Sequence, residues 1–313
     1  MDNYSKNTLF ILVSIVMKMS TYMINYHGLA NMNAAKPTKT ELLQARYGNQ
    51  PIPANLIWSP VVEQQLAHKS VRTFLDEPLP EGALETMVSA AQSASTSSAL
   101  HLWSLVAITD REMKQRLSDT IAATVPTDRI PWIEEAPALL LWVADASKSA
   151  GLTQEQKQQP AALEYLDSFL MASIDTSLAA QNAALAAESI GLGIVFLGVM
   201  RNAAEAVAEM IGLPPYTFVT FGMAVGRPDP ERASSPRPRM PQAAVLHHNG
   251  YQQDRYREHL DGYEAAYLQF RTSQNMRPTT WQQAVLASAT SMDYMGGREH
   301  LREMVTKQGF TLR

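Results

Sequence analysis

The chain has 313 residues, of which 46% are hydrophobic and 18% charged, a composition typical of a globular protein with a sizeable core. The net charge of −4 and isoelectric point near 6.0 argue against nucleic acid or an anionic membrane as partner, because both need a basic surface. The absence of cysteine excludes disulfides, thiolate metal sites and cysteine nucleophiles. The histidines lack metal-ligand spacing, so we expect no metal site.

The first 50 residues are expected to form an extension ahead of a single folded domain at residues 51–313. Leu9 to Met17 is an apolar run after Lys6, far short of the roughly 20 residues that cross a bilayer. No small-residue cleavage site follows it at once, and Met32 opens a polar stretch typical of a cytoplasmic start. We therefore expect a cytoplasmic protein whose extension is disordered or not native. Secretion remains the alternative, which N-terminal sequencing of the native protein would decide.

Helix and strand signals mix along the first half of the domain without a strict β-α-β rhythm. Ser59-Pro60 and Asp110 are typical first-turn and capping residues of helices. Apolar, β-branched runs between the helical segments are typical of strands. The predicted elements are a helix from residue 60, a helix at 83–94, a strand at 103–109, a helix at 110–121 and a strand at 139–144.

The second half begins with a long, alanine-rich helix expected at 160–190, which Gly191 and Gly193 end. From Tyr251 to the end the chain is expected to be mostly helical and polar. The tail from Gln252 carries too little apolar surface to fold alone, so we expect it to pack on the same domain or around a partner subunit. Between these, we predict a strand at 194–200, a helix at 203–211, a strand at 218–225, an exposed loop at 227–242 and a strand at 245–247.

The heptapeptide from His68 to Phe74 gathers Lys69, Ser70, Arg72 and Thr73 into one short stretch. Guanidinium and ammonium groups neutralise phosphate, and hydroxyls donate hydrogen bonds to its oxygens. The stretch therefore suits a phosphorylated cofactor, with a solvated basic turn as the alternative.

Other motifs are excluded by their context. Gly191, Gly193 and Gly198 resemble a dinucleotide fingerprint, but Phe196 stands where a glycine is needed, and these glycines close a helix instead of opening one. No P-loop lysine follows Gly198, and the sequence has no GxSxG motif for a serine hydrolase.

Taken in order, six segments of the chain resemble the flavin-dependent nitroreductase family, most closely its oxygen-insensitive, NADPH-preferring branch. The resemblance implies an α+β, three-layer α-β-α fold with a mixed, mainly antiparallel sheet flanked by helices. It also implies a homodimer with FMN at the subunit interface and NADPH or NADH as co-substrate. The segments are His68–Phe74, Ser95–Ser98, Asp175–Gly193, Phe196–Asn202, Gly222–Pro228 and Arg237–Pro241.

The same resemblance implies roles for individual residues. It assigns Ser70 and Arg72 to the phosphate, ribityl chain and ring edge, and it places the backbone amide of Gly198, the catalytic position, beside flavin N5. By composition alone, the serine-rich run would be a linker and Arg237 and Arg239 would be solvated. The implied cofactor-binding residues are His68, Lys69, Ser70, Arg72, Thr96, Ser97, Ser98, Phe196, Leu197, Gly198, Val199, Arg237 and Arg239.

Residues for the other substrates are implied by the same resemblance. Arg298 resembles an arginine near the substrate opening, and Arg271 or Arg277 could hold the 2′-phosphate of NADPH. The alternative is that these arginines only keep the surface of a helix hydrated, as arginines on exposed helices often do. We expect a helix start and a local salt bridge at Arg201 and Asn202, with a role as cofactor ligands as the alternative.

The chain departs from the family pattern in three places. Ala99 and His101 stand where an amide side chain is frequent, Val125 to Ile130 replaces a Gly-Gln element, and Val199 replaces a second glycine. A ring-contacting amide is therefore expected to be missing, and the space above the flavin to be narrower.

The expected activity is transfer of hydride from NAD(P)H through flavin N5 to a nitroaromatic or quinone acceptor, by a ping-pong mechanism. One alternative is a flavin reductase that supplies reduced FMN. The other is a non-catalytic flavin-binding protein.

Overall fold

The computed structural model describes residues 36–124 and 130–313. Our expectations for the apolar run at Leu9–Met17 and for residues 125–129 fall outside that part. The chain divides into a unit of residues 1–38 and a compact unit of residues 39–313. In the described ranges, no helix is both long and apolar enough to cross a membrane.

The compact unit begins earlier than the boundary we expected at residue 51. Helix α2, Lys39–Tyr47, buries Leu42 and Leu43, which are 3% and 6% exposed. The two leucines give this otherwise polar helix an apolar side, and it packs on α3, Pro60–Ala67. Only the residues before Lys39 fall in the other unit.

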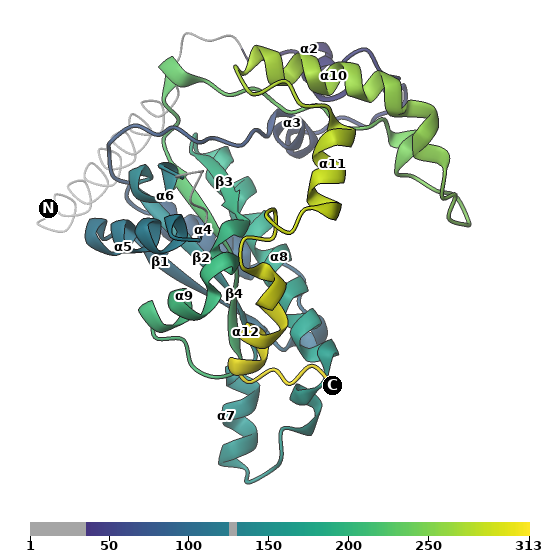
Figure 1. Cartoon of the computed structure of the whole chain (residues 1–313). Coiled ribbons are helices and arrows are strands. Elements are labelled where there is room, and N and C mark those ends of the chain that lie inside the picture. The colour runs from purple at the N-terminus through teal and green to yellow at the C-terminus, as the bar shows by residue number, and fades with distance from the viewer. Residues whose placement is uncertain (1–35, 125–129) are drawn as a thin grey trace, which may run out of the picture. The chain divides into compact units, whose positions relative to one another are not determined.

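A four-stranded antiparallel sheet forms the centre of the unit, in the order β1-β2-β4-β3 (Figure 1). Every residue of β2 is buried, because β2 lies between two strands and beneath helices on both faces, which explains its continuous apolar run. The strands are β1 Trp103–Ile108, β2 Ala138–Asp145, β3 Gly193–Leu197 and β4 Thr217–Gly226.

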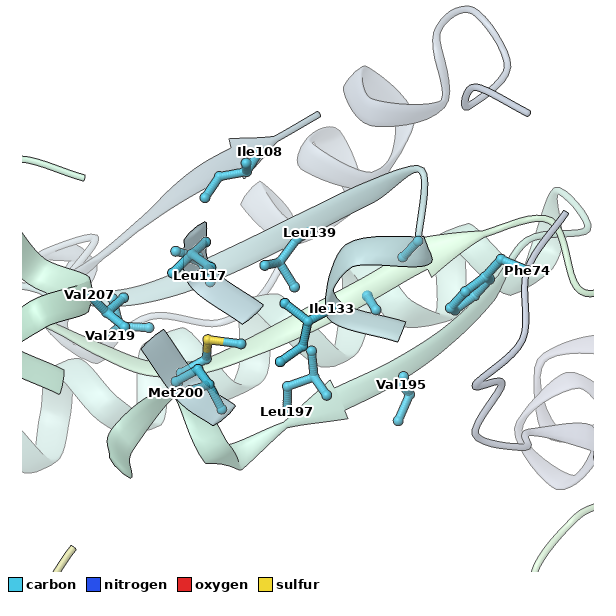
Figure 2. Close-up of a cluster of buried hydrophobic side chains, with 14 of the residues drawn as sticks. Phe74, Ile108, Leu117, Ile133, Leu139, Val195, Leu197, Met200, Val207 and Val219 are labelled. Carbon is cyan, nitrogen blue, oxygen red and sulfur yellow. The ribbon is translucent and has the colours of Figure 1, made fainter. Parts of the chain in front are cut away.

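Helices cover both faces of the sheet. Along β2, Leu139, Leu141 and Val143 join the core cluster of one face, drawn in Figure 2, whereas Leu140 and Trp142 join the cluster of the other. The first face is covered by α5 Arg111–Ala122, α6 Trp132–Glu135 and α9 Ala204–Met210, and the second by α4 Ala83–Gln92 and α8 Leu166–Ser189. The predicted three-layer α-β-α fold is therefore confirmed.

The polar tail packs on the same unit. Phe310 is fully buried against Phe169 and Tyr216, with ring centroids 5.2 Å and 5.9 Å apart. Upstream, Gly48 after α2 lies against Ala266 of the tail. The remaining helices are α7 Ser147–Glu155, α10 Leu260–Ser273, α11 Trp281–Thr290 and α12 Leu301–Lys307.

Three element predictions were wrong, and the others agree to within two residues. The long helix starts at Leu166, because Tyr165 is extended after a short 3-10 turn. The strand predicted to reach Met200 ends at Leu197, and Gly198–Ala203 forms a 3-10 helix, since a short apolar run does not distinguish buried strand from buried turn. Residues 245–247 form no strand and are mostly exposed.

Candidate functional site

The first basic segment, His68 to Arg72, lies along the outer edge of β3. Ser59 caps the start of α3 by accepting from the amide of Val62, and the helix ends at Ala67, directly before the segment. Ser70 forms a parallel bridge with Ile194, whose carbonyl accepts from the Val71 amide at 2.9 Å. A side chain at Gly193 would put its Cβ 2.5 Å from Cγ2 of Val71, so glycine permits this approach.

The second basic segment, Arg237 to Arg239, meets the first segment at a cavity of about 630 Å³, which we call the arginine pocket. Its walls combine aromatic rings with guanidinium groups: the Arg72 guanidinium lies 5.8 Å from the Trp132 ring and that of Arg237 lies 5.5 Å from the Phe270 ring. The lining residues are Ser70, Arg72, Thr73, Trp132, Glu231, Arg232, Ala233, Ser234, Ser235, Arg237, Phe270, Ser273, Gln274, Asn275 and Met276.

Arg72 and Arg237 differ from Arg232, at the rim of the pocket, in how their charge is balanced. Burial, and then the nearby Arg237, lower the pKa of Arg72. Within residues 36–124 and 130–313, neither guanidinium forms an ion pair with a carboxylate, whereas Arg232 at the rim is paired with Asp229 at 2.7 Å. A buried cation at Arg72 with a second cation beside it favours an anionic ligand.

The other members of the two basic segments face elsewhere. Nδ1 of His68 lies 2.6 Å from Oε1 of Glu188, and His68 and Arg239 line a second, mostly apolar cavity of about 670 Å³. Arg239 is exposed and donates to the carbonyls of Arg237 and Pro238 at 3.3 Å. Lys69 is half-buried and forms no ion pair in the part of the chain that the structure describes. Sequence reasoning grouped these residues with those of the arginine pocket. The structure places His68 and Arg239 at the second cavity, and Lys69 lines neither of the two.

The hydroxyls of Thr96 and Ser97 donate hydrogen bonds within the chain. Thr96 Oγ1 donates to Asp175 Oδ2 at 2.5 Å, and the amide and hydroxyl of Ser97 both donate to Oδ1 at 2.8 and 2.9 Å. Asp175, on α8, is 1% exposed and also accepts from the Leu102 amide. Together with Ser98, these residues lie outside the lining of the arginine pocket.

The rest of this loop is turned outward and conformationally unusual. Ser98, Ala99 and His101 have φ values of 49°, 56° and 51°, in the left-handed region that non-glycine residues seldom adopt. All three residues are exposed. A strained, exposed loop fixed by one buried carboxylate is a candidate binding element.

Gly198 directly follows the last residue of β3, and the side chains of its neighbours differ in how far they are exposed. Leu197 is buried and Val199 packs against the core cluster, so their side chains face inward. Phe196 is 38% exposed and packs edge-on against Phe221.

The guanidinium of Arg201 fills the space beside Gly198, lying 3.2 Å from where a Cβ would stand. Arg201 donates to the carbonyl of Thr220 at 2.6 Å, at the bulge where β4 slips against β2. We expected Arg201 to form a local salt bridge, and in the described residues it forms none.

The predicted substrate arginines make mostly local contacts. Arg271 donates to the Arg277 carbonyl at 2.7 Å and lies over the Tyr267 ring, outside the arginine pocket. Arg298 donates to the Met295 and Tyr294 carbonyls. It lies close enough to Arg201 that its charge, after burial, lowers the pKa of that residue. Arg298 thus lies near Arg201, whose guanidinium is beside Gly198.

Sequence reasoning missed several residues that shape the site. Trp132 follows Pro131 as a lone aromatic residue, which carries no motif, and Asp175 was noted only as part of a longer match. Arg46 lies in a segment assigned to the extension. In the described part of the chain, no group of three or more His, Asp or Glu could hold a metal ion.

Comparison with known proteins identifies the family. The Nitroreductase family profile matches residues 66–227, and the profile of its C-terminal domain matches residues 237–313. The chain is 34% identical to an NADPH-dependent oxidoreductase of Staphylococcus saprophyticus, covering 78% of the chain and 94% of the relative. It is 33% identical to an FMN reductase (NADPH) of Bacillus subtilis, covering 80% and 97%.

Solved structures agree with the sequence relatives. The NfrA1 nitroreductase of Bacillus subtilis superposes with a TM-score of 0.72 at 32% identity, over 80% of this chain and 99% of that one. An NADPH:FMN oxidoreductase of Vibrio harveyi, complexed with NAD+, superposes with a TM-score of 0.68 at 29% identity, over 82% and 100%. The chain belongs to the nitroreductase family.

Proposed function

We propose that the protein is an NAD(P)H-dependent FMN oxidoreductase whose cofactor lies against the arginine pocket. The observation that carries the proposal is the meeting of two basic segments, far apart in the sequence, at one cavity where Arg72 and Arg237 have no carboxylate partner among the described residues. FMN supplies the two-electron chemistry that the side chains lack. The relatives named FMN reductase (NADPH) and NADPH:FMN oxidoreductase support the choice of cofactor and co-substrate.

The residues present fit this cofactor. A phosphate suits Arg237 and the Ser70 hydroxyl, and a flavin ring suits a wall that holds Trp132 and Phe270. The reduced ring is anionic, so the desolvated guanidinium of Arg72 would stabilise it. Gly198 would offer its backbone amide to the ring, and the Arg201 guanidinium occupies the space that a Cβ at this position would need.

Within this function we propose nitroaromatic or quinone acceptors and a ping-pong order, because an open arginine pocket would admit NAD(P)H and the acceptor in turn. The rival activities are reduction of free FMN and simple flavin binding. A cytoplasmic location is part of the same proposal.

The visible spectrum of the purified protein tests the activity. We expect a bound-flavin absorption band that bleaches on anaerobic addition of NADPH and returns when a nitroaromatic or quinone is added. A band that NADPH and NADH both leave unchanged would favour a flavin-binding protein. Faster turnover with free FMN than with any nitroaromatic would favour a flavin reductase.

We further propose a homodimer, supported by an exposed apolar stripe along α8. Leu166, Leu170, Ile174 and Leu178 recur every fourth residue and are 44–52% exposed, while the alanines of the opposite side are buried. Asp175, next to Ile174, holds the 96–101 loop beside this stripe. A second copy packed on the stripe would receive that loop, which does not line the arginine pocket of its own chain.

Ile174→Glu is expected to convert the dimer into a monomer and to lower FMN retention, because a buried carboxylate without a partner is costly at an interface. Light scattering coupled to gel filtration measures the mass, and absorbance measures the bound flavin. Leu152→Glu is the matched control, since Leu152 is 61% exposed on a different helix, α7, and the change should leave both values unchanged. A dimer that survives Ile174→Glu would rule out this interface.

A further inference from the structure

Helix α2 lies ahead of the part of the chain that the family profiles match, which begins at residue 66, yet it belongs to the compact unit. Its next-to-last residue, Arg46, is 6% exposed. A buried arginine on a helix outside the matched region needs a structural reason, because guanidinium groups are seldom removed from water without partners.

The partners of Arg46 are backbone groups of the two basic segments and of α3. One terminal nitrogen donates to the Arg237 carbonyl at 2.8 Å. The other donates to the carbonyls of Leu66 and His68 at 2.7 and 2.8 Å. In return, the Arg46 carbonyl accepts from the Arg239 amide at 2.7 Å. One residue therefore connects both segments through three hydrogen bonds, and a fourth joins it to α3.

The bonding pattern depends on the shape of the guanidinium and not on its charge alone. In the described ranges, Arg46 forms no ion pair with a carboxylate, and its contacts are carbonyl oxygens at both ends of a planar fork. Burial, followed by the nearby Arg239, lowers its pKa to about 10, so it remains charged at neutral pH. A lysine ammonium lacks the rigid fork that spans two separate backbones.

We propose that Arg46 is a positioning residue, which holds the first and second basic segments at a fixed separation and thereby strengthens binding of the FMN phosphate. The inference rests on the proposed function, because it concerns the same site. Helix α2 acts as a brace: it supplies no group to the arginine pocket but fixes the backbones from which Ser70, Arg72 and Arg237 project.

The test compares FMN with riboflavin, which has the same ring but no phosphate, in fluorescence titrations of the flavin-free full-length protein. Arg46→Lys and Arg46→Met are expected to weaken FMN binding about tenfold or more, the effect of losing hydrogen bonds to a charged group. Riboflavin affinity should change less than about twofold. Lys39→Met removes one positive charge from the same helix at a residue whose ammonium lies over the Trp58 ring, and should leave both affinities at the wild-type value.

Two results would overturn the inference. One is an FMN affinity of Arg46→Lys equal to that of the wild type. The other is an equal loss of FMN and riboflavin affinity, which would indicate general loosening of the fold, and thermal unfolding of the flavin-free variants would record that loosening directly. If Arg46→Met does not fold, Arg46→Lys decides by the same criteria. A wild-type protein that binds neither flavin contradicts the proposed function itself.

Discussion

Replacing Arg72 with methionine is expected to weaken FMN binding about a hundredfold, because each lost hydrogen bond to a charged group is worth about 1.5–3 kcal/mol. The methionine keeps much of the apolar stem that packs near Trp132 and removes only the charged end. Fluorescence titration of the flavin-free variant measures the dissociation constant. Because Arg72 carries no ion pair in the described residues, its loss leaves no carboxylate unpaired, and the fold should persist.

The matched control is Arg257→Met. Arg257 is 66% exposed and paired with Asp254, so it resembles Arg72 in charge but lies outside both cavities. If the Arg72→Met protein binds FMN as tightly as the control does, the arginine pocket is not part of the FMN site.

Asp175→Ala is expected to destabilise the fold by about 3–5 kcal/mol, because it removes a buried acceptor of four hydrogen bonds and leaves the amides of Ser97 and Leu102 unsatisfied. Denaturant unfolding measures the change. Ser177→Ala on the same helix is the control, since Ser177 is exposed and its hydroxyl bonds only to the helix backbone. If the free energy of unfolding falls by less than about 1 kcal/mol, water replaces the carboxylate as the hydrogen-bond acceptor.

The same carboxylate makes stability depend on pH. Burial alone would raise the pKa of Asp175, but hydrogen bonds from Thr96, Ser97 and Leu102 outweigh burial and hold it below its ordinary value. A lowered folded pKa gives stability that is present above the unfolded pKa of about 4 and is lost as pH falls through the folded value. The difference in stability between the wild type and Asp175→Ala should therefore shrink in acid.

Most of the fold could be predicted from local signals. Asp110 caps its helix as expected, accepting from the Met113 amide at 2.7 Å, and the apolar run of β2 marks the central strand. Predictions failed where a local pattern fits two structures. Val199 and Met200 continue an apolar run, yet they pack into the core from a 3-10 turn.

The candidate site was predictable only in part. The family resemblance placed the basic segments of Arg72 and Arg237 at one site. Both residues line the arginine pocket. The partner of Thr96 and Ser97 is a carboxylate on α8, some distance along the chain, and no local rule links such residues. Arg46 lies in a segment that is mostly polar, so its composition gave no sign that two of its leucines are buried.

The bridge between Ser70 and Ile194 also protects β3 from other chains. β3 is an edge strand, and its residues Ile194 to Leu197 form an apolar, β-branched run of the kind that adds strands from neighbouring molecules. The first basic segment covers part of this edge through the bridge and the Val71 amide. The covering segment also carries Ser70 and Arg72. A change that detaches it would therefore disturb the arginine pocket and would also expose the unpaired edge of β3, which promotes aggregation.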